Sequence, residues 1–196
     1  MYMFLVVGAL VSSVGAWPLF SYTVTSWNLL AFRLLTSGLA SATKSPLLAA
    51  VSLALRFPAL VGACITVSVW WIVLVPIIYY LLKEPARRRG FLSFNFSPML
   101  LNLHFLNLPI AMVDFLSSST STHTLKFFDL WMGFIIMFIY ILFYLNVLDP
   151  SGLQFYPVFT PRSPLVLATY PLVLVLYWLC HRQANVLLLS YGQNQN

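Results

Sequence analysis

A histidine stands inside an apolar stretch that is long enough to cross a bilayer. His104 lies in FSPMLLNLHFLNLPIAMVDFL, residues 96–116. A titratable ring is costly to desolvate in hydrocarbon, and the rare ionisable groups inside membrane spans commonly mark functional sites. An imidazole beside a hydroxyl is the minimum for nucleophilic acyl chemistry, because the ring takes the hydroxyl proton and the oxygen then attacks an ester carbonyl.

The hydroxyl for this chemistry is expected in YTVTSWN, residues 22–28. Thr25 or Ser26 would supply the oxygen, with His104 as the base. Trp27 would add a wall and Asn28 a hydrogen-bond donor to a substrate-binding site. The alternative interpretation is structural, because Thr and Ser are also the residues preferred at a helix N-cap.

Polar side chains share one face with His104. Asn107 and Asp114 lie three and ten residues further on, and such steps return to nearly the same side of a helix. Asn107 is placed to orient the imidazole and to line the substrate site. Asp114 lies about 15 Å along the axis, so we expect Arg33 to form a structural ion pair with Asp114 or Asp149. The structural alternative for His104 is an interhelical hydrogen bond that holds a bundle together.

The composition indicates which kind of secondary structure positions these residues. Of the 196 residues, 61% are apolar and only 7% are charged, and the mean hydropathy is +0.90. A soluble domain is nearer 45–50% apolar and about 25% charged. The apolar runs are continuous rather than alternating, which argues against a transmembrane β-barrel. The sequence therefore predicts an all-α polytopic membrane protein, with residues 1–196 forming one integral-membrane helical domain.

About six transmembrane helices are expected. The segment between the second and third spans contains LLAAVSLAL, which either lies in the interface or extends the next helix. Pro76 predicts a kink in the third span. After the fifth span, Tyr156 lies in a turn-rich loop and suits an interfacial aromatic belt. The expected spans are about 3–20, 25–42, 58–82, 98–116, 128–147 and 164–181.

The net charge of +6 comes from scattered residues and not from a clustered basic face, so no nucleic-acid partner is expected. One cluster, Lys83 with Arg87, Arg88 and Arg89, indicates either a topology signal or a contact with anionic lipid. The two sides of a six-span topology carry five basic residues each. Because the charge is concentrated in this one loop, we expect an orientation in which the loop lies on the positively charged side of the membrane and both termini lie on the other side.

The remaining titratable groups predict no metal site and no cofactor. Cys64 and Cys180 fall in apolar spans and are interpreted as small buried hydrophobic residues. His123 lies in a polar loop, where we expect it to be solvated. His181 ends the last expected span, where it would interact with the helix C-terminus. The first span has no basic flank, so neither a cleavable signal peptide nor an Arg-rich presequence is predicted.

Three blocks give the chain a family resemblance: VTSWNLL at 24–30, LNLHFLNLPIAMVDFL at 101–116 and LDPSGLQFYPVF at 148–159. In this order they resemble the androgen-induced membrane protein family and its bacterial relatives. Some members are membrane-embedded threonine hydrolases that cleave fatty acid esters of hydroxy fatty acids. By position the resemblance assigns the nucleophile to Thr25 and the base to His104, and the location to the endoplasmic reticulum. The loops here are shorter, and the family's His–Trp-rich segment before the late Tyr-Pro is absent.

Two functions therefore remain open. The first is a lipid-ester hydrolase whose substrate enters laterally from the bilayer, because no soluble domain is expected to receive a polar one. The second is a non-catalytic accessory subunit of a larger membrane complex, such as a respiratory or ATP synthase assembly of the mitochondrial inner membrane. Low charge and short loops suit a subunit covered by other membrane-protein subunits. A transporter is disfavoured because the sequence has no internal repeat.

Overall fold

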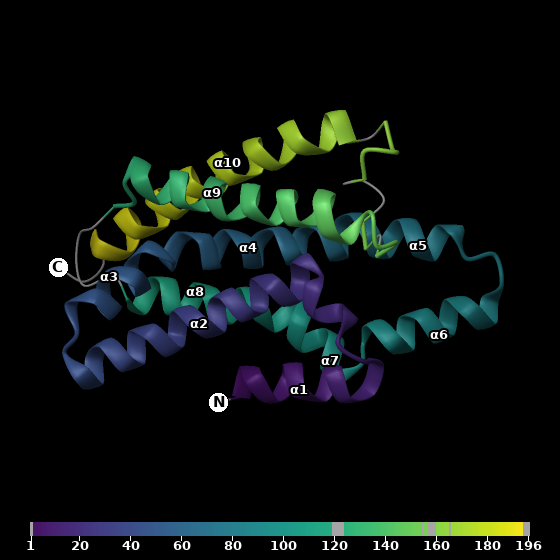
Figure 1. The fold of residues 1–196 in the computed structure, drawn as a ribbon, viewed down its shortest axis with the longest axis horizontal. Helices are drawn as coiled ribbons and strands as arrows, with labels where there is room; N and C mark the ends of the chain where they lie inside the picture. Colours follow the sequence, from purple (N-terminus) through teal and green to yellow (C-terminus); the bar gives the residue numbers. More distant parts are fainter. Residues whose placement is uncertain (1, 119–123, 154, 157–159, 165, 194–196) are drawn as a thin grey trace.

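The computed structural model describes residues 2–118, 124–153, 155–156, 160–164 and 166–193, and of residues 191–193 the backbone alone. Within these residues the chain is mostly helical and has no strand. Helix α1 (Tyr2–Val14) and the short 3₁₀ turn η1 (Trp17–Phe20) lead into α2 (Tyr22–Thr43). Figure 1 shows α2, α4, α8, α9 and α10 packed lengthwise beside one another. The all-α bundle predicted from composition is therefore present.

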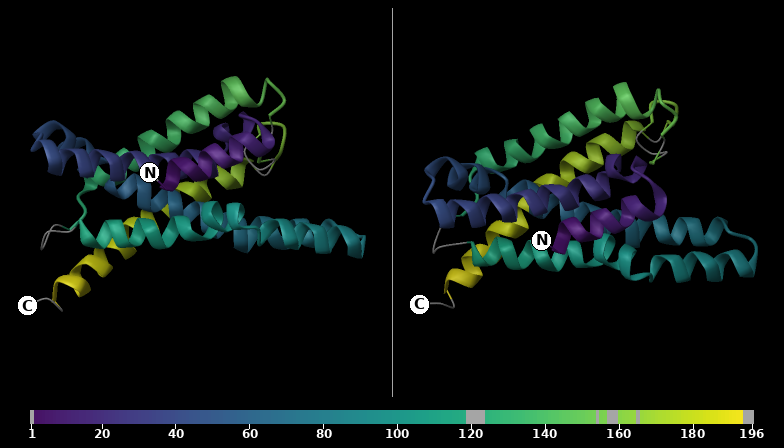
Figure 2. Two further views of the ribbon diagram at one scale, coloured as in Figure 1. Left: turned by 90° about the horizontal axis from the view of Figure 1, so that it is seen from below. Right: turned by 60° about the horizontal axis from the view of Figure 1, so that its bottom comes forward.

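The longest helical run goes from Pro46 to Leu81. It comprises α3 (Pro46–Ala54), α4 (Arg56–Ser68), a π-helical turn η2 (Val69–Leu74) and α5 (Val75–Leu81). The LLAAVSLAL stretch thus extends the following helix, which was one of its two expected placements. The chain then returns through α6 (Pro85–Asn95), as Figure 2 shows.

Two further runs complete the bundle. The first joins α7 (Pro98–Leu101), a π-helical turn η3 (Asn102–Leu106) and α8 (Asn107–Ser117). The second joins α9 (Phe127–Phe143) to a third π-helical turn, η4 (Tyr144–Leu148). Helix α10 (Val166–Gln193) follows and extends twelve residues past His181, where the last span was expected to end.

Four helical runs in the described ranges are long and apolar enough to cross a membrane, rather than the six expected. They are Pro46–Leu81, Pro98–Ser117, Phe127–Leu148 and Val166–Ser190. The first expected span is a helix of only 13 residues, because α1 ends before Gly15, whose φ is +86°. The second, α2, is long enough, but Arg33 and its many Ser and Thr residues make it less apolar than the other four.

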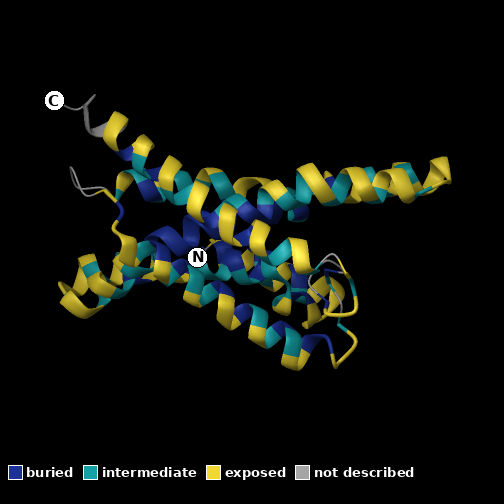
Figure 3. Cartoon of the chain, turned by 90° about the horizontal axis from the view of Figure 1, so that it is seen from above, coloured by how far each residue is buried: buried dark blue, intermediate teal, exposed yellow. Residues whose placement is uncertain are grey.

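The core is centred on α4. This helix contacts α2, α8, α9 and α10, and its side chains at Phe57, Val61 and Ala63 are fully buried. Figure 3 shows the buried residues concentrated there, with exposed residues on the outward faces of the surrounding helices. Many of these exposed residues are large and apolar, such as Leu167 and Phe138. Such a surface is typical of helices that face lipid.

Helix α2 packs in parallel with the η3–α8 run at a constant sequence offset. Two side-chain hydrogen bonds and one ion pair each join residues 81 positions apart. At the same offset lie two buried apolar residues, Leu30 and Ala111. These four positions on α2 are spaced three, four and three residues apart, which is the spacing of a coiled-coil seam. The four pairs are Thr23–His104, Ser26–Asn107, Leu30–Ala111 and Arg33–Asp114.

Each of the three π-helical turns comes shortly before a proline. Pro76 follows η2, Pro109 follows η3 and Pro150 follows η4. Proline lacks the backbone N–H, and its ring clashes with the carbonyl four residues earlier, which in all three cases lies within the π-turn. The kink predicted at Pro76 is therefore accommodated by widening the helix in the preceding turn.

Residues between the third and fourth expected spans form a helix that the sequence reasoning missed. Helix α6 was taken for a connecting loop because its only prominent feature is the basic cluster. Pro85 occupies its first turn, where a missing N–H is tolerated. Together, α5 and α6 form a helical hairpin, which Figure 2 shows extending past the end of the bundle.

Candidate functional site

The structure brings His104 to a hydroxyl at the start of α2, but this hydroxyl belongs to Thr23. His104 Nε2 lies 3.4 Å from Thr23 Oγ1, and both residues are buried. The hydroxyl of Tyr156, from the loop after α9, lies 3.4 Å from the same Thr23 oxygen. The Tyr156 hydroxyl also accepts from the Thr23 backbone N–H at 3.4 Å. These three residues, Thr23, His104 and Tyr156, are the candidate site.

Backbone contacts fix how the His104 ring is used. Its Nδ1 lies 3.3 Å from the carbonyl oxygen of Leu100, which can only accept a hydrogen bond. Nδ1 therefore carries the proton, and the lone pair of Nε2 faces Thr23. Trp70 stacks on the imidazole with ring centroids 3.9 Å apart, and Trp71 Nε1 donates to the His104 carbonyl oxygen at 2.8 Å. The ring is thus held with its basic nitrogen towards a hydroxyl.

All three π-helical turns converge on this site. Turn η3 carries His104, and η2 carries the two tryptophans that hold it. From η4, the Tyr144 hydroxyl donates to the backbone carbonyl oxygen of Tyr156 at 3.1 Å. Single π-turns within α-helices are frequent at functional sites, because the extra residue re-aims the side chains beside it.

Tyr156 is buried, although it was expected in an exposed interfacial belt. Burial disfavours the phenolate and raises the pKa of Tyr156 above its ordinary value of 10.0. Its hydroxyl therefore remains a neutral hydrogen-bond donor beside Thr23.

Thr25 does not meet His104, which corrects the expected catalytic pair. Two residues along an α-helix turn the side chain by about 200°, so Thr25 points away from the face that carries Thr23. Neither Thr25 nor Ser26 caps the helix, because the N-cap is Ser21, whose hydroxyl accepts from the Val24 N–H at 3.3 Å. The structural alternative given for these two residues is therefore wrong as well.

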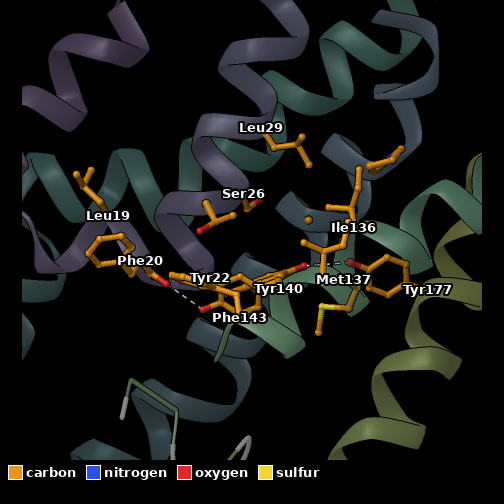
Figure 4. A pocket seen from close by; sticks show the side chains of 14 residues that line it. Leu19, Phe20, Tyr22, Ser26, Leu29, Ile136, Met137, Tyr140, Phe143 and Tyr177 are labelled. Atoms are coloured by element: carbon orange, nitrogen blue, oxygen red, sulfur yellow. Dashed lines mark hydrogen bonds between the residues drawn. The ribbon is translucent and has the colours of Figure 1, made fainter. Parts of the chain in front are cut away.

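Thr25 instead lines a cavity of about 270 Å³ between α2, α4, α9 and α10. The side chains of Leu29, Ile136 and Met137 make its wall largely apolar (Figure 4). At one end the hydroxyls of Tyr22 and Tyr177 lie 3.3 Å apart. This cavity occupies the face of α2 next to the one that contacts His104, and Ser26 stands at its edge.

The three residues expected to bind substrate have other surroundings. Trp27 is fully buried, and its indole N–H donates to the Met3 carbonyl oxygen at 3.0 Å, which ties α2 to α1. Asn28 is half-buried and does not line the cavity. Asn107 donates from Nδ2 to Ser26 Oγ at 3.5 Å. The His104 ring is oriented instead by the Leu100 carbonyl oxygen, which lies 3.3 Å from Nδ1.

The expected ion pair between Arg33 and Asp114 is present, with Nη2 and Oδ1 3.4 Å apart. Arg33 also donates from Nη1 to Ser52 Oγ at 2.6 Å. Asp149, the other expected partner of Arg33, instead accepts from Thr160 Oγ1 at 2.8 Å and lies 3.6 Å from Arg162. The α2–α8 pair therefore carries a charged pair at one end and the candidate site at the other.

The described residues contain no group of three His, Cys, Asp or Glu side chains that could hold a metal ion. Cys64 on α4 and Cys180 on α10 are half-buried, and their side chains are close enough to hydrogen-bond to each other. His181 lies within α10 rather than at its end, and its Nε2 contacts the Lys126 carbonyl oxygen at 3.1 Å. His123 lies outside the described residues.

Comparisons with protein-family models, curated proteins and solved structures found no match. Functional inference therefore rests on the geometry of Thr23, His104 and Tyr156 in an apolar helical bundle.

Proposed function

We propose that this protein is a membrane-embedded lipid-ester hydrolase in which Thr23 is the nucleophile and His104 the general base. The observation that carries the proposal is the 3.4 Å contact between His104 Nε2 and Thr23 Oγ1, made while Nδ1 of the same ring faces the Leu100 carbonyl oxygen. A nucleophile–base contact is often longer in an unliganded enzyme than in the reacting complex. The proposal keeps the chemistry implied by the resemblance to the androgen-induced membrane protein family but moves the nucleophile from Thr25 to Thr23.

The proposed reaction has two stages. His104 Nε2 takes the proton of Thr23 Oγ1 as this oxygen forms a bond to the ester carbonyl carbon. The carbon–oxygen bond to the alcohol then breaks, and the alcohol leaves with the proton from His104, which gives an acyl-threonine. Water next attacks the acyl carbon while His104 takes a proton from it. The bond between this carbon and Thr23 Oγ1 then breaks, the fatty acid leaves, and His104 returns the proton to Thr23 Oγ1.

Tyr156 supplies a hydrogen bond to the oxyanion in this proposal. Its hydroxyl lies 3.4 Å from Thr23 Oγ1, next to the point of attack. A fixed donor in a dry site stabilises developing charge more than the same donor in water.

The proposed substrate class is a fatty acid ester of a hydroxy fatty acid, which would enter from the bilayer. The apolar cavity beside α2 provides room for a hydrocarbon chain. It lies on the face of α2 next to the face that carries Thr23. The Ser26–Asn107 contact separates the two, so substrate binding would have to open it. By the same resemblance we place the protein in the endoplasmic reticulum.

The test uses purified full-length protein in mild detergent and a fatty acid ester of a hydroxy fatty acid, with product measured by mass spectrometry. We expect Thr23→Ala and His104→Ala each to lower turnover by about 10²-fold or more, whereas Thr23→Ser retains it. Thr43→Ala, at an exposed threonine at the other end of α2, is the control that should leave turnover unchanged. Thr25→Ala tests the nucleophile that the family resemblance gives.

Each outcome assigns a role. If Thr25→Ala abolishes turnover while Thr23→Ala leaves it unchanged, the nucleophile is the one that the family resemblance gives. If neither Thr23→Ala nor His104→Ala changes turnover, the chain is not a hydrolase of this kind.

The second candidate is a non-catalytic accessory subunit of a multi-subunit membrane complex, for example in the mitochondrial inner membrane. The observation that favours it is the burial of Thr23 and His104, which are only 7% and 5% exposed. A closed constellation of this kind also serves to join helices. An obligate subunit would co-purify with other membrane proteins, whereas a chain that runs alone and monodisperse in mild detergent argues against an obligate subunit.

A further inference from the structure

The α5–α6 hairpin extends past the bundle in both views of Figure 2. Phe57 on α4 and Gly133 on α9 lie at the same level, because a Cβ on Gly133 would come within 3.2 Å of Phe57. From that level the α4–α5 run continues about nine residues further than the α9–η4 run, or about 14 Å. A bilayer whose hydrocarbon core is matched to Phe127–Leu148 therefore leaves the hairpin tip outside that core.

The two arms of the hairpin are tied together at base and tip. At the base, Trp70 Nε1 donates to Asn95 Oδ1 at 3.0 Å, and Trp71 lies against Phe96 with ring centroids 5.7 Å apart. At the tip, Arg88 Nε donates to the Leu82 carbonyl oxygen at 2.6 Å. The hairpin is thus a defined element of the fold.

Apolar and aromatic side chains cover the stem of the hairpin. Ile77 is 51% exposed, Tyr80 82% and Leu81 68%. On the returning arm, Phe94 and Phe96 are also exposed. Aromatic side chains exposed at the level where a helix leaves the hydrocarbon are typical of the interfacial belt.

Basic side chains cover the tip. Lys83, Arg87 and Arg89 are exposed, and the acidic residue among them is Glu84, which pairs with Arg87 at 2.8 Å. Positive charge at the tip therefore exceeds negative charge. Apolar surface followed by excess positive charge matches the order of a membrane leaflet, with hydrocarbon first and phosphate groups beyond it.

We infer that the hairpin tip is a binding site for anionic phospholipid headgroups on one side of the membrane. The phosphates of the surrounding leaflet occupy the surface formed by Lys83, Arg87 and Arg89, and the exposed aromatic residues of the stem lie among the headgroups. Net negative lipid is favoured over zwitterionic lipid because only the former complements the excess charge. A second copy of the chain would bring two tips of like charge together and is disfavoured.

The experiment measures lipid selectivity of the purified full-length protein by native mass spectrometry, with equal amounts of phosphatidylglycerol and phosphatidylcholine. The tested variant is Lys83→Gln/Arg87→Gln/Arg89→Gln. Arg88 is left in place because it holds the Leu82 carbonyl and lies over the Tyr79 ring. Each basic residue near an anionic surface contributes about fivefold, so the variant should lose more than tenfold of the preference for phosphatidylglycerol.

The matched control removes three exposed basic residues outside the hairpin, in Lys44→Gln/Lys126→Gln/Arg182→Gln. Lys44 is the C-cap of α2, Lys126 is the N-cap of α9 and Arg182 lies in α10. This control should keep the selectivity within about twofold. If a triple variant does not fold, the single hairpin variants Lys83→Gln and Arg89→Gln are compared with the single control variants Lys44→Gln and Arg182→Gln. As a local readout, phosphatidylglycerol in nanodiscs should slow hydrogen exchange of α6 more than phosphatidylcholine does.

Three results would overturn the inference. One is equal retention of the two lipids by the unchanged protein. Another is an equal loss of selectivity in both triple variants, which would make the effect one of total charge. The third is a change from dimer to monomer in the hairpin variant with unchanged lipid selectivity, which would assign the tip to a second copy.

Discussion

The contact between α2 and α4 at Gly62 gives a prediction whose size can be worked out from the structure. A Cβ on Gly62 would lie 2.8 Å from Ser26 Oγ and 3.4 Å from Ser26 Cβ. The first distance is too short for a real contact, so Gly62→Ala forces α2 and α4 apart or turns the Ser26 side chain. Small residues commonly allow such close approach of membrane helices.

Two opposing contributions set the magnitude. Overpacking of a well-packed interface costs about 1–3 kcal/mol. Replacing a glycine by alanine inside a helix contributes about 1 kcal/mol in the other direction. Gly62→Ala should therefore lower the free energy of unfolding by about 0–2 kcal/mol.

Gly38→Ala is the matched control, because Gly38 is exposed on α2 and a Cβ there would meet nothing within 4 Å. It should gain about 1 kcal/mol from helix propensity alone. The two alanine variants are thus expected to differ by about 1–3 kcal/mol, measured as unfolding by circular dichroism in mixed micelles of dodecyl maltoside and dodecyl sulfate.

Repeating the substitution in a Ser26→Ala protein tests whether the short distance to the Ser26 hydroxyl is the cause. Ser26→Ala removes the oxygen that the new Cβ would meet, so Gly62→Ala introduced into Ser26→Ala should be neutral or stabilising. If Gly62→Ala costs the same with and without the Ser26 hydroxyl, the close approach described here is not the reason for a glycine at this position.

Three further perturbations test other parts of the fold. Mild oxidation with copper phenanthroline should crosslink Cys64 to Cys180, seen as a disulfide-linked peptide pair; an absence of the link in folded protein contradicts the α4–α10 contact. Arg33→Met should lower the free energy of unfolding by about 3–5 kcal/mol because it removes the ion-pair partner of Asp114, whose side chain is only 10% exposed; Arg33→Met/Asp114→Leu should recover most of this in the same unfolding assay. Tyr156→Phe should lower turnover about tenfold or more. Because burial raises the pKa of Tyr156, ionisation of this residue should cause no fall in activity or stability below pH 10. A fall below pH 10 in either pH profile that Tyr156→Phe removes would refute this.

The polar face of η3 and α8 was readable from the sequence, and its partner face on α2 was readable in part. The steps from His104 to Asn107 and Asp114 predict a single helical face, and the structure uses all three positions. Once Arg33 pairs with Asp114 in a parallel arrangement, counting back ten residues from each gives Thr23 opposite His104. The sequence reasoning did not combine these two steps and chose Thr25.

Other features depend on tertiary packing that the sequence does not reveal. Tyr156 reaches Thr23 from a loop more than 130 residues away, and only the packing of η4 and its loop brings them together. The basic cluster obscured the helical pattern of α6. The sequence reasoning used Pro76 as the site of a kink, but it did not extend this to Pro109 and Pro150, which follow η3 and η4 in the same way.

The constant offset between α2 and α8 has a consequence during biosynthesis. Arg33 is made 81 residues before Asp114, and translation at about 5–20 residues per second separates them by about 4–16 s. Throughout that interval α2 carries a guanidinium that its eventual carboxylate partner does not yet neutralise, at a cost of about 2.5–3.5 kcal/mol at the centre of a span. We expect α2 to wait at the edge of the bilayer or within the insertion machinery until α8 emerges, so that the site around Thr23 closes only after the charged pair at the other end of the helix has formed.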